Sequence, residues 1–261
     1  MSAPDVQIHA VATGKAAELV KAHSKPSPNG LIFYSGWFCP YVARVWIALE
    51  EKGVEYEYRE INPYKKEESF LKINPKGLVP AIERKGFALY ESLVLLEYLE
   101  EAFPDSAKIF PESAEERAIS RMRIDMVSKK VIPAFFRTMI SQTEEEQRQA
   151  RKSFTEALKE FATYLSEEKP FVGGEKLDAV DISLAPWLSR LYIIEENRGG
   201  PITAEETSER FLRYVKDVTQ RESVQNVFSD KAQYKQIYQR YLRNEAQSEA
   251  AKAVRAGRPI P

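Results

Sequence analysis

The fold is decided by residues 31–53, which read LIFYSGWFCPYVARVWIALEEKG. The run Leu31–Tyr34 is apolar and aromatic, which predicts a short buried strand. Pro40 suits the first position of a helix, where its missing N–H is no loss, and apolar residues then recur at helical spacing. Gly53 stands where a C-terminal helix cap belongs. The stretch therefore predicts a strand followed by an amphipathic helix.

The residues that follow extend this unit to about position 103. Val54–Ile61 predicts a second strand, Lys66–Ile73 a short helix, and Val79–Arg84 with Phe87–Tyr90 a hairpin. Ser92 can cap a last helix. The order strand, helix, strand, helix, hairpin, helix predicts an α/β domain with a mixed four-stranded sheet and helices on its faces.

Strand signals stop after Pro104, and later apolar residues such as Phe154, Leu158 and Phe161 follow helical spacing. We therefore expect an irregular N-terminal extension over residues 1–29 and an α/β domain over 30–106. An all-helical domain is expected over 112–261, with a polar tail from about 244.

Composition excludes several classes of protein. The 261 residues include 38 Lys and Arg against 39 Asp and Glu, so no basic excess favours nucleic acid as a partner. No apolar run is long enough to span a membrane, and we expect no secretory signal before the first strand. One cysteine forms neither an intramolecular disulfide nor a multi-cysteine metal site, and no metal is expected. We expect a soluble, cytosolic globular protein.

Cys39 follows the first strand, precedes Pro40 and begins a helix. The N–H groups and the dipole of a helix N-terminus favour thiolate, and such cysteines have pKa values of roughly 3.5–7.5. A buried structural cysteine is the alternative, and position alone does not decide between the two. The residue three positions after Cys39, where a second cysteine could act as a resolving partner, is Val42. Any thiol chemistry here therefore uses a single sulfur.

Two further signals carry both a structural and a functional interpretation. Pro80 at the start of a strand is either an edge proline or a cis proline, and a cis Val79-Pro80 bond would free the backbone of Val79 to pair with a peptide. Ser92 is most simply a helix cap beside Glu91, but the same helix start suits a ligand carboxylate, and Glu91 an ammonium group.

Taken together, these motifs resemble the cytosolic glutathione transferases. The resemblance rests on FCPY at residues 38–41, NPKGLVP at 74–80 and YES at 90–92, and a cysteine at the helix start is similar to the omega class. DISLAPW at 181–187 resembles a buried segment of that family's helical domain. Asp178 stands where the family usually has Ser or Thr, and we expect it to keep the capping role. The resemblance covers about residues 30 to 220 and implies a thioredoxin-like N-terminal domain followed by an all-helical domain that forms the second-substrate pocket.

The resemblance also implies roles for individual residues. Cys39 matches the nucleophile that forms a mixed disulfide with glutathione, and Val79, before a cis Pro80, matches the residue that pairs with the glutathione backbone. Glu91 and Ser92 match the residues that bind the γ-glutamyl end. The other implied contacts are Phe38, Tyr41 and Lys66 (or its neighbour Lys65) for glutathione, and Trp187 and Arg190 for the second pocket. Glutathione is the implied cosubstrate, and the expected state is a cytoplasmic homodimer.

The function expected first is a glutathione-dependent thiol transferase that removes glutathione from mixed disulfides or reduces dehydroascorbate or aryl-ketone adducts. Two alternatives stay open. One is a conjugating transferase that activates glutathione through Tyr34 or Ser35, and the other is a non-catalytic binding module on the same fold.

Overall fold

The computed structural model describes residues 10–62, 64, 65 and 67–260, which form two compact units. Residues 10–110 with 220–231 make up the sheet unit, and residues 111–219 with 232–260 make up the helical unit. The strands of the sheet unit are β1 (Leu31–Ser35), β2 (Glu57–Glu60), β3 (Ala81–Arg84) and β4 (Phe87–Tyr90). Its helices are α1 (Gly14–Ala22), α2 (Pro40–Lys52), α3 (Glu68–Leu71), α4 (Ser92–Ala102) and α11 (Glu222–Asn226).

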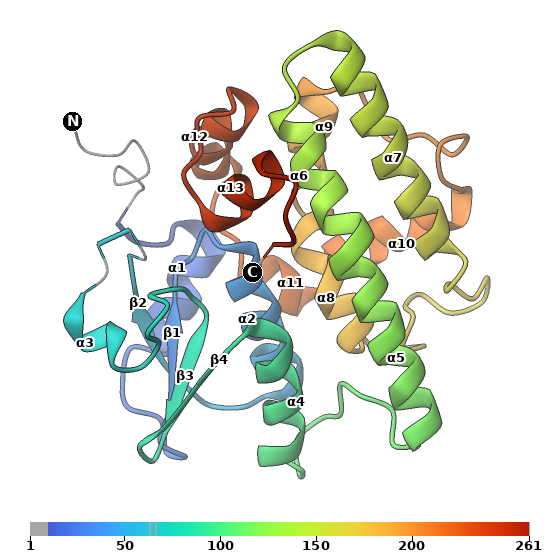
Figure 1. Ribbon diagram of the computed structural model, residues 1–261. Coiled ribbons are helices and arrows are strands. Elements are labelled where there is room, and N and C mark those ends of the chain that lie inside the picture. The colour runs from blue at the N-terminus through green and yellow to red at the C-terminus, as the bar shows by residue number, and fades with distance from the viewer. Residues whose placement is uncertain (1–9, 63, 66, 261) are drawn as a thin grey trace. The chain divides into compact units, whose positions relative to one another are not determined.

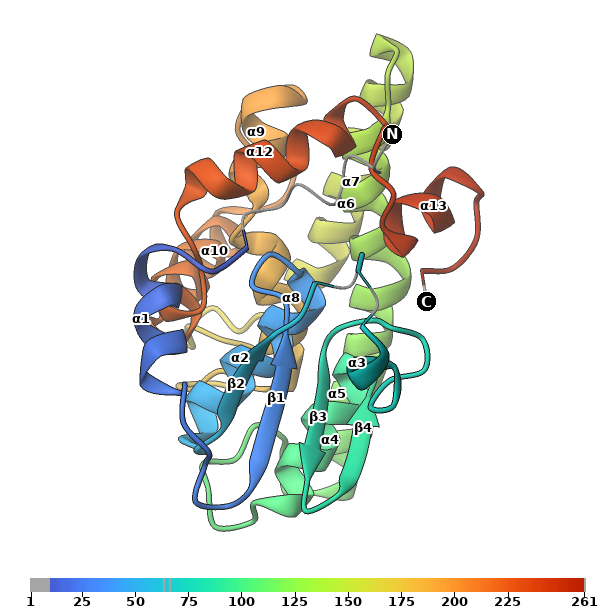
Figure 2. The ribbon, with the colours of Figure 1, turned by 90° about the vertical axis from the view of Figure 1, so that its left-hand side faces the viewer.

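The four strands of the sheet unit lie in the order β2–β1–β3–β4, as Figure 2 shows. β1 pairs parallel with β2 and antiparallel with β3, and β3 pairs antiparallel with β4. Helices α2 and α4 lie on one face of the sheet, and α3 lies on the opposite face (Figures 1 and 2). The predicted mixed four-stranded sheet with flanking helices is therefore confirmed.

Helix α2 forms where the sequence predicts it. Pro40 is its first residue, and Gly53 ends it in the left-handed conformation with a φ of 61°, donating its N–H to the Glu50 carbonyl at 3.1 Å. The side chain of Trp46 is fully buried. The other apolar residues buried between α2, α4 and the sheet include Val42, Val45, Leu49, Leu95, Leu96 and Leu99. This apolar layer holds α2 against the sheet and thereby fixes the position of the N-terminus of α2.

Two strands are shorter than the sequence suggests. The second strand begins at Glu57 instead of Val54, and β3 begins at Ala81 instead of Val79. Pro80 has no N–H to donate to the sheet, so regular pairing starts only after it. The predicted helix from Lys66 is shortened to the single turn of α3; Lys66 itself lies outside the described residues.

The N-terminal extension, predicted to be irregular, contains helix α1 instead. Its contacts are with residues far along the chain: the Thr13 N–H donates to Ser229 Oγ at 3.0 Å, and Lys15 Nζ donates to Gln225 Oε1 at 2.8 Å. Segment 220–231 therefore lies in the sheet unit, although the sequence analysis assigns it to the helical domain. Arg221 anchors this segment to α2 through two hydrogen bonds to the Glu51 carboxylate, at 2.8 and 2.9 Å.

The helical unit is built from α5 (Ala114–Met126), the π-helical turn η2 (Val127–Val131), α6 (Ile132–Ile140), α7 (Glu144–Ala162), α8 (Ala179–Leu188), α9 (Leu191–Asn197), α10 (Glu209–Gln220), α12 (Lys231–Leu242) and α13 (Glu249–Arg255). Helix α5, the turn η2 and α6 follow one another without a break. Pro133 explains the π turn, because proline cannot donate to the carbonyl one turn earlier and its ring clashes with that carbonyl.

Helix α8 is the buried centre of the helical unit. The Asp178 side chain caps it by accepting hydrogen bonds from the N–H groups of Val180 and Asp181, at 2.8 and 3.1 Å. Asp178 thus keeps the capping role expected for the Ser or Thr that it replaces. The fully buried Asp181 carboxylate accepts from the Asp178 N–H at 3.0 Å and the Tyr214 hydroxyl at 2.8 Å, which ties α10 to α8.

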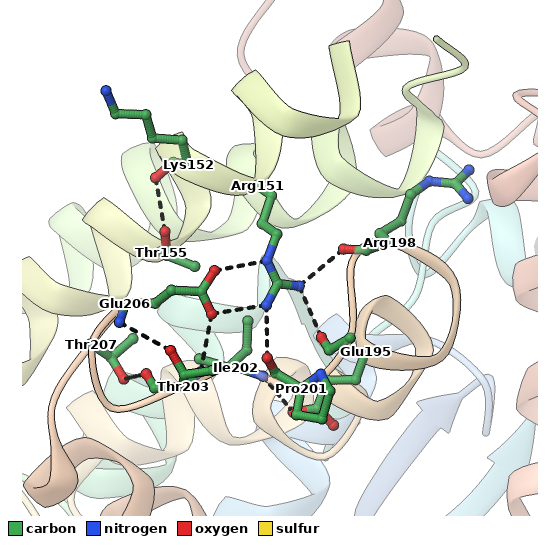
Figure 3. A network of polar contacts seen from close by, with 11 residues as sticks. Arg151, Lys152, Thr155, Glu195, Arg198, Pro201, Ile202, Thr203, Glu206 and Thr207 are labelled. Atoms are coloured by element: carbon green, nitrogen blue, oxygen red, sulfur yellow. Dashed lines mark hydrogen bonds and ion pairs between the residues drawn. The ribbon is translucent and has the colours of Figure 1, made fainter. Parts of the chain in front are cut away.

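The loop between α9 and α10 is held by Arg151 of α7 (Figure 3). Its guanidinium donates to both carboxylate oxygens of Glu206, at 2.8 and 2.9 Å. It also donates to the carbonyls of Arg198, Gly200 and Pro201, at 2.9, 2.9 and 2.8 Å. Five bonds from one planar cation fix the loop more firmly than a lysine could.

The polar tail predicted from about residue 244 contains the helix α13. The Ser248 hydroxyl caps it by accepting from the Ala251 N–H, and Arg137 Nη2 donates to the Val254 carbonyl at 2.8 Å. Tyr234 and Tyr238 of α12 are buried. Among the residues that the structure describes, no helix combines the length and the apolar character that crossing a membrane requires.

Candidate active site

The single thiol lies at the junction of β1 and α2, in the sheet unit. Cys39 is the N-cap of α2, and its N–H donates to the Gly36 carbonyl at 2.8 Å, which closes the turn of residues 36–39. The side chain is partly exposed. The sulfur therefore sits at the positive end of the α2 dipole, the position that favours thiolate.

The backbone of Val79 faces this sulfur. Cys39 Sγ lies 3.8 Å from the Val79 carbonyl oxygen, and the Val79-Pro80 bond is cis, as the sequence analysis considered. The turn that delivers Val79 is held by Asn74, whose amide donates to the Leu78 carbonyl at 2.7 Å. The residues at 74–80 are thus brought to the thiol, although Val79 lies 40 positions after Cys39 in the sequence.

A buried guanidinium that the sequence analysis did not single out joins the predicted residues. Arg44 of α2 is 2% exposed, lies over the Tyr41 ring at 5.4 Å, and donates through Nη1 to Ser92 Oγ at 3.2 Å. Burial lowers the pKa of Arg44 to about 10, an effect partly offset by the Tyr41 and Cys39 side chains. Arg44 keeps its charge at neutral pH and links the thiol end of α2 to the start of α4.

Glu91 and Ser92 form the start of α4, with one correction to their roles. The N-cap is Glu91, not Ser92, and the Ser92 hydroxyl accepts a hydrogen bond from Arg44 instead of capping the helix. Glu91 has a φ of 78°, which is rare for a residue other than glycine and typical of functional sites. Its carboxylate pairs with Lys76 Nζ at 2.6 Å.

Behind the thiol, the turn of residues 36–39 is anchored by Glu60 at the end of β2. Its carboxylate accepts hydrogen bonds from the Trp37 N–H at 3.1 Å and from the Tyr58 hydroxyl at 2.6 Å. Burial raises the pKa of Glu60 to about 7, against the lowering effect of these two hydrogen bonds. A glutamate at the end of a strand ordinarily points to solvent, so the local pattern gave no signal for this role.

The remaining predicted residues fall into three groups. Phe38 lies next to the thiol and stacks with Tyr64, with ring centroids 6.4 Å apart. Lys66 lies outside the described residues, so its role stays a prediction. Trp187 and Arg190 are buried in the helical unit, where the Arg190 guanidinium donates to the Pro186 carbonyl at 2.6 Å. Their part in a second-substrate pocket also stays a prediction.

No group of three His, Cys, Asp or Glu side chains that could hold a metal ion occurs within the described part of the chain. What the arrangement offers chemically is one partly exposed sulfur at a helix N-terminus, a peptide backbone beside it, and a carboxylate and a hydroxyl at the start of α4. Such a set suits covalent thiol chemistry on a small peptide with charged ends.

Comparison with known proteins identifies related chains. Residues 33–107 match the family model "Glutathione S-transferase, N-terminal domain", and residues 142–217 match "Glutathione S-transferase, C-terminal domain". Glutathione S-transferase omega-1 of Sus scrofa is 35% identical over 192 residues, covering 70% of this chain and 78% of the pig protein.

Two solved structures extend the comparison. The crystal structure of glutathione transferase Omega 3C from Trametes versicolor is 48% identical, covers 91% of this chain and 100% of its own, and has a TM-score of 0.83. A rice glutathione transferase solved in complex with glutathione is 27% identical, covers 83% and 98%, and has a TM-score of 0.74.

Proposed function

The chain belongs to the glutathione S-transferase family, and we propose that this glutathione transferase is a thiol transferase of the omega type. Cys39 is its proposed nucleophile. The observation that carries the proposal is the position of the sulfur, at the N-terminus of α2 and 3.8 Å from the Val79 carbonyl. A thiolate placed there can reach the sulfur of a peptide that pairs with the backbone of Val79.

The proposed reaction has two steps. The Cys39 thiolate attacks the glutathionyl sulfur of a mixed disulfide, a bond forms between the two sulfurs, and the acceptor thiolate leaves with the electron pair and takes up a proton. The thiolate of a second glutathione then attacks the glutathionyl sulfur on Cys39, which releases glutathione disulfide and restores the Cys39 thiolate. One thiol suffices for this cycle, and the sequence contains one cysteine.

Glutathione would bind across the residues that surround the thiol. The Val79 backbone would pair with its cysteinyl residue, Ser92 and the start of α4 would hold the γ-glutamyl carboxylate, and Glu91 would hold the ammonium group. Arg44, held against Ser92 Oγ at 3.2 Å, would fix the direction in which that hydroxyl points. Phe38, Tyr41 and Lys66 complete the proposed glutathione site, with Trp187 and Arg190 assigned to the pocket for the second substrate.

The alternative of a hydroxyl-dependent conjugating enzyme is less well supported by the geometry. Ser35 is fully buried, and the Tyr34 hydroxyl donates to Glu83 Oε2 at 2.9 Å on the sheet. Both residues belong to β1, whereas Cys39 is the N-cap of α2. The proposed substrates are glutathionyl mixed disulfides in the first place; dehydroascorbate and glutathionyl aryl ketones, which contain no disulfide, are further substrates that the resemblance to the omega class implies.

Two paired assays test this proposal. The turnover of a small glutathionyl mixed disulfide, followed through the release of glutathione disulfide, should exceed the rate of glutathione conjugation to an aryl halide, and Cys39→Ser should abolish the first activity. Conjugation that exceeds thiol transfer and survives Cys39→Ser would support the conjugating alternative, and the absence of both activities would support a binding module.

We also propose that the protein is a cytoplasmic homodimer. A single-thiol enzyme that consumes glutathione needs a reducing compartment. Large apolar side chains are exposed in each unit: Phe87 and Val94 in the sheet unit at 54% and 48%, and Ile119 and Met122 in the helical unit at 48% and 73%. Burial of these side chains between two copies would remove them from water. Light scattering coupled to size-exclusion chromatography should give twice the chain mass, and Met122→Glu should shift it toward the monomer.

A further inference from the structure

The carboxylate proposed to hold the ammonium group of glutathione is already paired with a lysine of the chain. Lys76 Nζ lies 2.6 Å from Glu91 Oε1 and 5.6 Å from the centroid of the Tyr90 ring. Both partners are about half exposed, 52% for the Lys76 side chain and 47% for Glu91. The pair is therefore open to solvent and to a ligand that arrives from solvent.

The backbone on both sides of this pair is fixed. The Lys76 N–H donates to Asn74 Oδ1 at 3.0 Å within the turn that leads to Val79, and Glu91 is held as the N-cap of α4. Only the lysine side chain needs to move for the ion pair to open. The hydrogen bond to Glu91, and after it the charge of Glu91, raise the pKa of Lys76 above its ordinary value, so the lysine is cationic wherever the enzyme works.

The chemical identity of the lysine group matters here. A lysine side chain ends in a primary ammonium, and the γ-glutamyl end of glutathione also carries a primary ammonium. Both ammonium groups can pair with the Glu91 carboxylate. The face of the Tyr90 ring adds a cation–π contact for the ammonium group that occupies this position. Two ammonium groups on one carboxylate repel each other, so binding of the ligand weakens or displaces the lysine.

We propose that Lys76 is an intramolecular competitor for the glutathione ammonium, which occupies Glu91 in the free protein and lowers the affinity for glutathione. This inference rests on the proposed function, because it takes Glu91 as the ammonium site. It implies that the site discriminates by charge: a ligand with an ammonium group has to replace Lys76, whereas a ligand without one leaves the ion pair in place.

The test is calorimetric titration with S-methylglutathione, which cannot form a disulfide, against wild type and Lys76→Met. The variant should bind about two- to fivefold more tightly, the range expected when an exposed ion pair no longer has to be broken. Lys72→Met, a change at an exposed lysine four residues earlier, is the matched control and should bind as wild type does. A second titration uses the analogue of S-methylglutathione in which hydrogen replaces the γ-glutamyl amino group (the deaminated analogue), and with it the gain from Lys76→Met should disappear.

The outcomes separate this inference from the proposed function. Equal or weaker binding of S-methylglutathione by Lys76→Met overturns the inference and leaves the glutathione site in place. A gain that persists with the deaminated analogue also overturns it, because the lysine then does not compete with an ammonium group. Failure of wild type and both variants to bind S-methylglutathione would overturn the proposed glutathione site itself. In a Glu91→Gln background, the effect of Lys76→Met should be lost.

Discussion

Glu60 should make the stability of the sheet unit depend on pH in a direction opposite to that of most carboxylates. Its pKa is about 7 in the folded protein and about 4.5 in an unfolded chain, so between these values the folded state holds a proton that the unfolded state has lost. The stabilisation of the folded state by this Glu60 proton is complete below pH 4.5 and is lost as the pH rises through 7. At about 1.4 kcal/mol for each pH unit, the interval amounts to about 3 kcal/mol.

Glu60→Gln isolates this effect. The glutamine carbonyl can accept from the Trp37 N–H and its amide can donate to the Tyr58 hydroxyl, so both contacts survive without a titrating group. The variant should match wild type near pH 4.5 and exceed its free energy of unfolding by about 3 kcal/mol above pH 8. Glu101→Gln, at an exposed position on α4, is the control and should leave the pH profile unchanged.

The assay is denaturant unfolding followed by tryptophan fluorescence. Of the three tryptophans, Trp37 and Trp46 lie in the sheet unit and Trp187 lies in the helical unit. A Trp187→Phe background therefore restricts the signal to the sheet unit for wild type and variant alike. A difference in free energy of unfolding between Glu60→Gln and wild type that stays constant from pH 4.5 to 8 would contradict the raised pKa of the buried Glu60 carboxyl.

Three further outcomes follow from the contacts described above. Asp178→Ala should lower the free energy of unfolding by about 1–2 kcal/mol because it removes the cap of α8, whereas Asp178→Asn keeps the cap and should not; thermal unfolding measures both, and equal losses would contradict the capping role. Arg151→Lys should lower the free energy of unfolding by about 2 kcal/mol, because a lysine cannot make the paired hydrogen bonds to Glu206. An unchanged melting temperature would contradict this expectation. Glu91→Ala should weaken glutathione binding by about 1.5 kcal/mol or more through the loss of a charge-assisted contact, and unchanged affinity in calorimetry would remove Glu91 from the site.

The elements that local sequence specifies were predicted well. The strand and helix within residues 31–53 form as expected, because the apolar spacing, Pro40 and Gly53 all act over a few positions. Helix α1 was missed because its partners are distant: Ser229 is 216 positions from Thr13. Helix α13 likewise has a distant partner, because Arg137 donates a hydrogen bond to the Val254 carbonyl, and no local sequence pattern predicts this contact.

The candidate site shows the same division. The family resemblance supplied Cys39, Val79, Glu91 and Ser92, and the structure gathers them around the junction of β1, α2 and α4. Arg44 and Glu60 escaped the sequence analysis, as did Lys76. Arg44 lies within the apolar part of α2 between Val42 and Leu49, and Glu60 ends a strand, and a charged residue is ordinarily solvated rather than buried. Only the tertiary structure shows which of their charges are buried or paired.

The nucleophilic role of Cys39 is tested by the rate at which glutathione becomes attached to Cys39 during turnover. Rapid quenching followed by mass spectrometry of the intact protein should show one glutathionyl adduct after reaction with a small glutathionyl mixed disulfide. The adduct should form at least as fast as the steady-state turnover and should disappear on addition of reduced glutathione. Turnover without an adduct, an adduct slower than turnover, or full activity in Cys39→Ser would contradict a mechanism in which Cys39 is the nucleophile.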